Sequence, residues 1–426
     1  MNHLSKFLRT LFRLYEALLL LALFGFSSAQ GASYYVAKTG NDSNPGTLSQ
    51  PFESFAQGVS ALEPGDTLYI RGGIYTEKLD LLKKTGVPGK QITIAAYPGD
   101  TVTLQPVGRT YAIVPRQLDY VTFDGLIWDG INMDRSGNGV YGPRIIESKH
   151  TTFQNMEFKR IWGMIYISRS THTIFRNCKI HDFLTETGVP GTRYMGIYAH
   201  DGTDLLIEGN DIYNNPGGGM QIQPGPWRNV IIRNNRVHDN LTLSNQPAVG
   251  GILVWASLHS GGLITDAQIY NNVVYNNGLG AGRIVGKNYA PGINISNATD
   301  GAKVWNNTVY GNSGYGLSVQ NSTTTNTVVQ NNISFENTDG AVYNGGIGSV
   351  IDHNLTTNPR FINMAEFDFR LQSNSPAIDR GVALTEVTMD ILNIRRPKGE
   401  THDIGAYEGG VSDFSQPRPP KSLVID

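Results

Sequence analysis

The sequence predicts an all-β solenoid, a fold in which the chain winds through repeated coils of short strands. Three observations predict it: a recurring asparagine motif, a composition rich in glycine and poor in charge, and short segments in which apolar and polar residues alternate. Glycine accounts for 49 of the 426 residues, and charged residues for 16%. Such a composition is typical of a turn-rich β architecture and disfavours a helical one.

The asparagine motif recurs in five segments. Each has an apolar residue, an Asn three places later, an apolar residue two places further and then a second Asn. The segments are IEGNDIYNN (207–215), IRNNRVHDN (232–240), IYNNVVYNN (269–277), VWNNTVYGN (304–312) and VQNNISFEN (329–337). The first Asn of each segment and then Asn354 follow one another at steps of 25, 37, 35, 25 and 22 residues. This spacing indicates coils of about 22 residues with insertions at some turns.

The same frame extends upstream, where apolar residues replace the asparagine. The segments FDGLIWDG (123–130), FQNMEFKR (153–160) and FRNCKIHD (175–182) place Leu126, Met156 and Cys178 at that position. We expect the later asparagines to stack as a buried, hydrogen-bonded column. Cys178 is the one cysteine, so no internal disulfide can form, and we expect this side chain to pack in the core.

The first 32 residues predict a secretory signal peptide. Basic residues precede the short apolar run ALLLLALFGF (17–26), and small residues follow it in SSAQGA (27–32). The run is short for a membrane span, so we expect export to the periplasm or the exterior, without stable membrane insertion after cleavage. An uncleaved anchor is the alternative.

The net charge of −2 provides no basic field for nucleic acid.

Residues 33–118 predict a helix (FAQGVSAL, 55–62) before strands at 68–70 and 92–97, and a helix there could cap the open end of a solenoid. The line NDSNPGT…PGDTLYIRGGIYTEKL…KQITIAAYPGD resembles the N-terminal region of secreted pectate-lyase-like proteins, and is similar to polysaccharide lyase families six and nine. The resemblance covers most of residues 33–355. It implies a right-handed parallel β-helix, with coils over 119–357. Residues 358–410 resemble a C-terminal capping segment that closes the last coil, and we expect disorder in 411–426.

A second strand precedes each asparagine strand, and its alternation predicts which side chains face outward. Polar and aromatic side chains on a flat parallel sheet suit a sugar chain, because aromatic faces pack on sugar rings and amides bond hydroxyl groups. An ordinary solvated face is the alternative. The outward residues that we expect to bind substrate are Tyr166, Gln221, Gln223, Trp255 and Asn294.

Insertions at 184–195, 241–249, 257–265 and 278–290 centre the expected groove on the strands that start near 164, 196, 220 and 252. There His200 could act as base, Tyr198 as acid or stacking platform, and Arg193 as the clamp on a substrate carboxylate. Lys287 and Arg283 are alternative bases. Alternatively, His200 and Asp201 only brace the Asp-Gly-Thr turn that follows.

Calcium is a possible cofactor, because hard carboxylate oxygens are its preferred ligands. The predicted ligands are Asp201 with Asp182 or Glu186. Families six and nine use a basic residue beside calcium-binding carboxylates, but their acidic cluster has no residue-by-residue match in this chain. The Asp-Pro-His signature of mannuronan epimerases and the signatures of polygalacturonases are absent.

The leading functional hypothesis is an exported lyase that cleaves an acidic, uronate-containing polysaccharide by β-elimination. Two alternatives remain open. A glycoside hydrolase would need two carboxylates about 5–10 Å apart in one groove, for which Asp201 with Asp182 or Glu186 is the candidate pair. A glycan-binding or cell-surface scaffold protein would need no catalytic residue. We expect a monomer whose partner is its polysaccharide.

Overall fold

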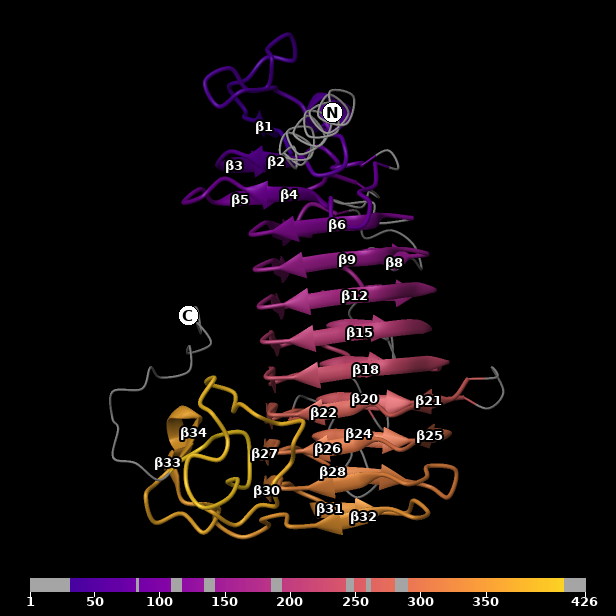
Figure 1. The fold of residues 1–426 in the computed structure, drawn as a ribbon, viewed down its shortest axis with the longest axis vertical. Helices are drawn as coiled ribbons and strands as arrows, with labels where there is room; N and C mark the ends of the chain where they lie inside the picture. Colours follow the sequence, from indigo (N-terminus) through magenta and orange to yellow (C-terminus); the bar gives the residue numbers. More distant parts are fainter. Residues whose placement is uncertain are drawn as a thin grey trace, which may run out of the picture.

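The structure is a computed structural model that describes residues 31–81, 84–108, 117–133, 142–184, 194–242, 249–257, 262–279 and 290–409. Three parallel sheets form the solenoid, and from residue 144 onward the chain passes through them in turn in each coil (Figure 1). The predicted parallel β-helix is therefore confirmed. The predicted signal peptide, apart from Gly31 and Ala32, and the predicted disordered tail lie outside the described residues, and both stay predictions.

Sheet I contains fourteen strands, of which β21 and β25 lie beside its main path. Its strands are β1 (Ser33–Val36), β2 (Thr67–Ile70), β4 (Ile92–Ala96), β6 (Asp119–Asp124), β9 (Lys149–Gln154), β12 (Ser170–Arg176), β15 (Gly202–Glu208), β18 (Trp227–Arg233), β21 (Ile264–Thr265), β22 (Gln268–Tyr270), β25 (Thr299–Asp300), β26 (Lys303–Trp305), β29 (Val328–Gln330) and β32 (Val350–Asp352).

Sheet II contains ten strands. They are β3 (Gly73–Tyr75), β5 (Val102–Leu104), β7 (Ile127–Asp129), β10 (Glu157–Lys159), β13 (Lys179–His181), β16 (Asp211–Tyr213), β19 (Arg236–His238), β23 (Val273–Tyr275), β27 (Thr308–Tyr310) and β30 (Ile333–Phe335). Sheet III contains eight strands. They are β8 (Arg144–Ile146), β11 (Ile165–Ser168), β14 (Ile197–Ala199), β17 (Met220–Ile222), β20 (Ile252–Trp255), β24 (Ile293–Ser296), β28 (Tyr315–Gln320) and β31 (Gly340–Asn344).

One hydrophobic core fills the space between the three sheets. On sheet III the side chains expected to point inward are almost fully buried in it: Ile165, Ile167, Ile197, Ala199, Met220, Ile222, Ile252, Val254, Ile293, Ile295, Leu317 and Val319. On sheet I, the rings of Phe123, Phe153 and Phe175 stack from coil to coil with centroids 4.9 Å apart. The alternation of residues along these strands therefore predicts correctly which side chains face the core.

The asparagine motif forms a ladder at the corner between sheets I and II. In each step one Asn donates its backbone N–H and its Nδ2–H to the Oδ1 of the Asn in the next coil; for Asn235 and Asn272 these distances are 3.0 and 2.9 Å. The ladder runs from Asn210 to Asn354, and every member up to Asn332 is at most 1% exposed. The predicted buried polar column is confirmed.

Each ladder asparagine follows a residue in the left-handed backbone region. Gly209, Asn234, Asn271, Asn306 and Asn331 have φ between 48° and 67°. Glycine and asparagine adopt this conformation at low cost, which explains the Asn-Asn doublets in the sequence. The second asparagine of the motif forms a parallel ladder after sheet II, through Asn215, Asn240, Asn277, Asn312 and Asn337.

Cys178 occupies the ladder position one coil before Asn210. Its backbone N–H donates to Asn210 Oδ1 at 2.8 Å, and its thiol, only 1% exposed, contacts the carbonyl of Phe153. Burial raises the pKa of this thiol to about 12, so it stays protonated and unreactive near neutral pH. The expected packing role of Cys178 agrees with this environment.

The N-terminal helix α2 (Phe55–Ala61) packs on the first coils. The Ser54 hydroxyl accepts the Gln57 N–H as the helix cap, and Phe55 and Val59 join the core. Gly58 lets the helix approach closely, because a Cβ there would lie 2.7 Å from a Val36 methyl group. In the described part of the chain, no helix has the length and hydropathy that a membrane crossing requires.

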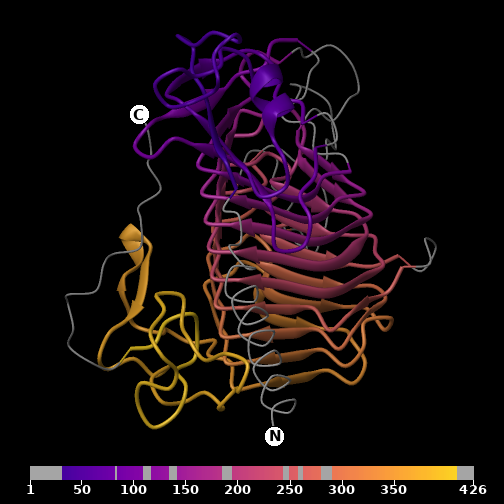
Figure 2. The ribbon, with the colours of Figure 1, turned by 45° about the horizontal axis from the view of Figure 1, so that its top comes forward.

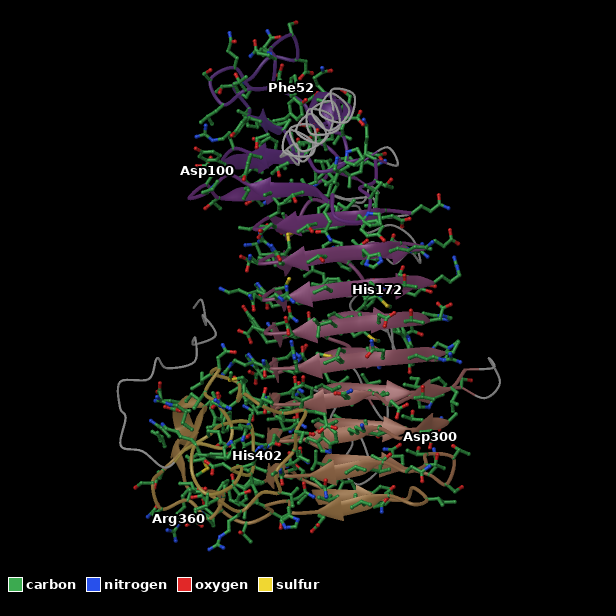
Figure 3. The ribbon with its side chains drawn as sticks, in the orientation of Figure 1. Phe52, Asp100, His172, Asp300, Arg360 and His402 are labelled. Carbon is green, nitrogen blue, oxygen red and sulfur yellow. The ribbon has the colours of Figure 1, made fainter. Side chains whose placement is uncertain are left out.

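The C-terminal segment lies along the side of the last coils. It contains β33 (Phe361–Asn363), the 3-10 helix η2 (Met364–Glu366) and β34 (Asp368–Leu371), and Figures 2 and 3 show it beside the stack, with Arg360 and His402 within it. Its apolar residues pack on sheet II, where Phe369 contacts Tyr275 and Tyr310. A role in closing the last coil stays a prediction.

An aromatic column stacks along the outer face of sheet II. The rings of His181, Tyr213, His238 and Tyr275 follow one another with centroids 4.6, 5.1 and 4.6 Å apart. His238 is fully buried, and its two ring nitrogens lie 2.7 Å from Asp239 and 3.0 Å from Asp211. This packing indicates a structural role for the column.

The ladder predicts a large stability cost for one substitution. In Asn272→Ala, the buried N–H groups of Asn235 lose their acceptor and the Ile232 carbonyl loses its donor. We expect the unfolding free energy to fall by about 3 kcal/mol, measured by urea denaturation. The exposed Asn374→Ala is the control and should change it little. Equal effects of the two variants would contradict the role of the ladder.

His238 predicts a pH-dependent contribution to stability. Burial lowers the pKa of His238, but the hydrogen bonds to Asp211 and Asp239 outweigh burial and raise this pKa above 6.5. A raised pKa stabilises the folded protein below the unfolded pKa, and this contribution is lost as the pH rises through the folded pKa. We expect the stability difference between wild type and His238→Gln to shrink from about pH 6 to pH 9. A difference independent of pH would contradict this.

Candidate active site

The candidate site lies on the outer face of sheet III, where outward side chains form columns from coil to coil. The pairing of β11, β14 and β17 places Tyr166, Tyr198 and Gln221 beside one another, as the alternation predicts. The rings of Tyr166 and Tyr198 stack with centroids 5.7 Å apart and an interplanar angle of 11°. The two rings form an aromatic platform in which Tyr166 is partly exposed and Tyr198 only 9% exposed, so a sugar ring would contact it mainly at Tyr166.

His200 lies next to this platform. Its backbone N–H donates to the Ile167 carbonyl at 2.7 Å, which extends the pairing of β14 beyond its last residue. Its ring centroid is 6.2 Å from that of Tyr166 and 6.3 Å from that of Tyr198, and 39% of its side chain is exposed. The imidazole is therefore accessible to a molecule that contacts Tyr166.

Asp201 orients the imidazole of His200. Its Oδ1 lies 3.0 Å from His200 Nδ1 and accepts the Ser168 hydroxyl at 2.7 Å and the Arg169 N–H at 3.1 Å. Burial raises the pKa of Asp201, but the bonds from Ser168 and His200 outweigh it and hold this pKa below its usual value. An ionised carboxylate at Nδ1 favours a proton on that nitrogen and leaves Nε2 as the basic atom.

Ser168 donates its hydroxyl hydrogen to Asp201, so the three residues do not form a nucleophilic triad, in which the serine donates to the histidine. The sharp turn after Asp201 needs Gly202, whose φ is +155°. A Cβ there would lie 2.2 Å from the Ser170 carbonyl oxygen and 2.8 Å from the ring of Trp227. The Trp227 indole N–H in turn donates to the Ala199 carbonyl at 3.2 Å, which fixes the end of β14.

Arg144 is a site residue that the sequence analysis did not identify. It pairs with Tyr166 from β8, and its guanidinium carbon lies 5.4 Å from the centre of the Tyr166 ring. Arg144 is exposed, so its charge is available to an anionic ligand. A signal was present: RIIESKHTTFQN (144–155) aligns with YISRSTHTIFRN (166–177), one coil of 22 residues later.

The remaining predicted binding residues differ in exposure. Gln223 and Trp255 are partly exposed, and Gln223 donates to Gln221 at 2.9 Å. Gln221 is only 2% exposed and Asn294 is fully buried. The expectation of an open polar face along the whole sheet is therefore wrong at these two positions, although their role in binding stays a prediction. The accessible part of the site is concentrated around Tyr166 and His200.

The structure separates the predicted acidic ligands. Asp201 follows sheet III, whereas Asp182 follows β13 of sheet II, where it bonds His181 at 2.7 Å and accepts an amide hydrogen of Asn214. The two carboxylates therefore belong to different corners of the coil. Arg193, Glu186 and Lys287 lie outside the described residues, and so do most of the predicted insertions. Their proposed roles stay predictions.

The described residues do not fit a calcium site. Among them, no group of three or more Asp, Glu, His or Cys side chains could hold a metal ion. The oxygens of Asp182 and one oxygen of Asp201 already accept hydrogen bonds from protein groups. A carboxylate cage of the kind calcium prefers is therefore not formed by this part of the chain.

Two family descriptions match the sequence. "Pel9A-like, right handed beta helix region" matches residues 34–190, and "Right handed beta helix region" matches residues 117–375. Both descriptions name a right-handed helix, as the resemblance found in the sequence implies. The second match spans more than half of the chain, including all of the described strands of sheet III.

Known proteins with similar sequences include two pectate lyases. Pectate lyase PEL9 of Emericella nidulans is 22% identical over 249 residues, which span 58% of this chain and 49% of that protein. Pectate lyase L of Dickeya dadantii is 23% identical over 423 residues, which span 88% of this chain and 90% of that protein. The crystal structure of pectate lyase Pel9A has a TM-score of 0.62 at 18% identity, covering 90% of this chain and 98% of that one. This structural likeness shows the shared fold.

The contact between His200 and Asp201 predicts which nitrogen of the neutral His200 imidazole carries the proton. Long-range ¹H–¹⁵N spectra of the neutral imidazole should show the proton of His200 on Nδ1, because the carboxylate accepts it there. In Asp201→Asn we expect the Nε2–H tautomer to gain population. The imidazole signal that disappears in the spectrum of His200→Gln is assigned to His200. A wild-type imidazole protonated mainly on Nε2 would contradict the orientation.

Proposed function

This chain belongs to the right-handed β-helix family and has a pectate-lyase-like fold, and on that premise we propose that it is an enzyme that cleaves an acidic polysaccharide by β-elimination on sheet III. Its substrate is a uronate-containing chain, and it acts after export, as the N-terminal segment predicts. The observation that carries the proposal is the joint placement of Tyr166, His200 and Arg144 on one accessible surface, with the ring of Tyr198 stacked against that of Tyr166.

The reaction requires removal of one proton and departure of one oxygen. A base removes the hydrogen from C5 of a uronate ring, and the C5–H electron pair becomes a C4=C5 double bond. The C4–O bond then breaks, and its electron pair leaves with the glycosidic oxygen, which takes up a proton. Neutralising the uronate carboxylate lowers the barrier, because negative charge develops beside it at C5.

The described residues supply each of these needs. His200 Nε2 serves as the base, since Nδ1 faces the carboxylate of Asp201. The Arg144 guanidinium, which lies over the Tyr166 ring, binds the uronate carboxylate. Tyr166 and Tyr198 carry the sugar ring, and the Tyr198 phenol is the proposed acid for the leaving oxygen.

Calcium remains an expectation, and no step of this scheme passes through it. The described residues form no carboxylate cage, so charge neutralisation is assigned to Arg144. A glycoside hydrolase receives less support, because its pair of carboxylates has to face one groove. Asp201 and Asp182 belong to different corners of the coil.

The proposal predicts a specific loss of activity in His200→Gln. Wild type, incubated with pectate, alginate and glycosaminoglycans with and without calcium, should release unsaturated products detected by their ultraviolet absorbance. Replacing the base should lower kcat by about 10²–10⁴-fold. The control is His353→Gln, because His353 Nδ1 lies 2.8 Å from the neighbouring Asp352 in a similar pair on the last coil.

The outcomes separate the candidate functions. Unsaturated products that depend on His200 but not on His353 support the lyase. Reducing ends without unsaturation indicate a hydrolase. Silence across the panel, with and without calcium, or equal activity of His200→Gln and wild type, would overturn the proposal. Polysaccharide binding without turnover would favour a non-catalytic glycan-binding protein.

A further inference from the structure

A cavity of about 550 Å³ lies away from sheet III, at the corner between sheets I and II. One wall is the outer side of four coils, represented by Arg176, Glu208, Arg233 and Tyr270. The other wall is the C-terminal segment, including Met389 and, at the inner end, Tyr407. No step of the proposed reaction uses these residues.

Buried polar groups without partners line this cavity. Arg236 is 8% exposed, and its Nη2 donates to the Tyr275 hydroxyl at 2.9 Å, but its Nε and Nη1 have no hydrogen-bond partner among the described residues. The hydroxyl of Tyr407, 2% exposed, and the Oδ1 of Asn234 also lack partners there. Each such group costs about 1–3 kcal/mol if nothing binds it.

Arg236 remains charged in this environment. Burial lowers the pKa of Arg236, but Tyr275, Tyr407 and Asp211 favour the charged form and raise this pKa above its usual value. Among the described residues no carboxylate forms an ion pair with Arg236. The neighbouring Asp211 accepts a hydrogen bond from His238, and the hydrogen bonds to Asp211 and Asp239 outweigh burial and raise the pKa of this imidazole. The guanidinium therefore keeps two nitrogens, Nε and Nη1, without a hydrogen-bond partner in the described part of the chain, and Asp211 on the adjacent strand is its nearest cross-strand carboxylate.

The outer part of the cavity carries two arginines that share one carboxylate. Glu208 bonds two arginines: Arg176 through Nε, and Arg233 through Nε at 2.7 Å. Arg233 also donates to the Tyr270 hydroxyl at 2.9 Å. One carboxylate thus compensates two guanidinium groups. Glu386, the other acidic residue of this wall, is exposed to solvent, where its charge is screened.

The wall formed by the C-terminal segment is held in place. Asn271 donates from Nδ2 to the Met389 carbonyl at 2.6 Å, and its Oδ1 accepts from Arg396 at 3.2 Å. Arg396 and Glu408, both with fully buried side chains, form an ion pair within the segment. The cavity is therefore preformed, which lowers the entropic cost of binding a ligand.

The lining defines the chemistry of the occupant. Arginine N–H donors and the Tyr407 phenol suit a carboxylate, and the unpaired Asn234 Oδ1 suits a hydroxyl group. Tyr270 and the side chains of Met389 and Leu392 offer apolar surface for a ring face. The volume falls within the range of small-ligand sites, about 300–1,000 Å³, and accommodates one or two sugar rings.

We propose that this cavity is a second binding site, specific for the carboxylate of a short acidic saccharide whose acid group contacts Arg236 and Tyr407. The choice of a uronate among carboxylated sugars rests on the proposed function. The site itself rests on the cavity and on the unpaired groups of Arg236, Tyr407 and Asn234 that line it. It would retain a mono- or disaccharide product away from the catalytic surface.

Binding is measured by titration calorimetry on the full chain in the His200→Gln background, so that the saccharide is not consumed. The probes are galacturonic acid and digalacturonic acid, with galactose as the neutral control and inorganic phosphate as the simple anion. We expect the two acids to bind and galactose to bind at least tenfold more weakly. Phosphate binding as tight as that of the acids would identify a general anion site and overturn the saccharide proposal.

Three variants locate the site. Arg236→Met and Tyr407→Phe should each weaken digalacturonate binding at least tenfold, because each removes a donor to the carboxylate. Met389→Trp fills the cavity from its exposed wall without removing a buried charge, and it should abolish binding. Arg228→Gln, at an exposed position of β18 that does not line the cavity, is the control.

The two proposals fail in distinguishable ways. Unchanged digalacturonate binding in Met389→Trp, or no binding at all in the His200→Gln background, would overturn the second site and leave the lyase assay unaffected. With an intact His200, Met389→Trp should retain the rate of cleavage on polymer, because Met389 is remote from sheet III. Binding that disappears in Arg144→Gln but persists in Met389→Trp would place the saccharide on sheet III and also contradict the second site.

Discussion

The asparagine ladder between sheets I and II is the interaction on which the rest of the structure depends. Each amide satisfies backbone groups of two coils and the amide of the next, so a coil cannot slip by one residue without leaving several buried polar groups unpaired. Because the ladder fixes the register of sheets I and II, it also fixes which residues of sheet III lie side by side. The aromatic platform is a consequence of that register.

The two surfaces argued to bind ligands depend on the ladder in different ways. On sheet III, the stacking of Tyr166 on Tyr198 requires adjacent coils to be in register, and the turn at Gly202 then brings Asp201 onto His200. At the corner cavity, the left-handed residues that precede the ladder, such as Asn234 and Asn271, point their side chains away from the core. There they meet the C-terminal segment, which closes the cavity.

The sequence predicts the repeated part of the molecule well, because its signals are local and recur. The asparagine spacing and the alternation at Ile165 and Ile167 correctly predict the coils, the inward face and the outward neighbours. The Asn-Asn doublets indicate the ladder, but the left-handed backbone of the first member becomes clear only in the structure.

The features that sequence reasoning missed depend on contacts between distant segments. The alternation gives the face of the sheet on which Gln221 and Asn294 lie but carries no information on their burial. In the sequence, Asp182 directly follows His181 and Asp201 directly follows His200. In the fold, Asp182 lies after a strand of sheet II and Asp201 after a strand of sheet III, so the two carboxylates are at different corners of the coil. The lateral position of the C-terminal segment depends on pairs such as Asn271 with Arg396, 125 residues apart, which no local pattern indicates.

The most direct test of the central claim is a crystal structure of the His200→Gln variant with an oligosaccharide of the cleaved polymer. We expect a sugar ring against Tyr166 and Tyr198, its carboxylate on Arg144, and the C5 hydrogen directed at the position of the missing imidazole. A saccharide bound elsewhere, with sheet III empty at saturating concentration, would contradict the assignment of the active site to this face.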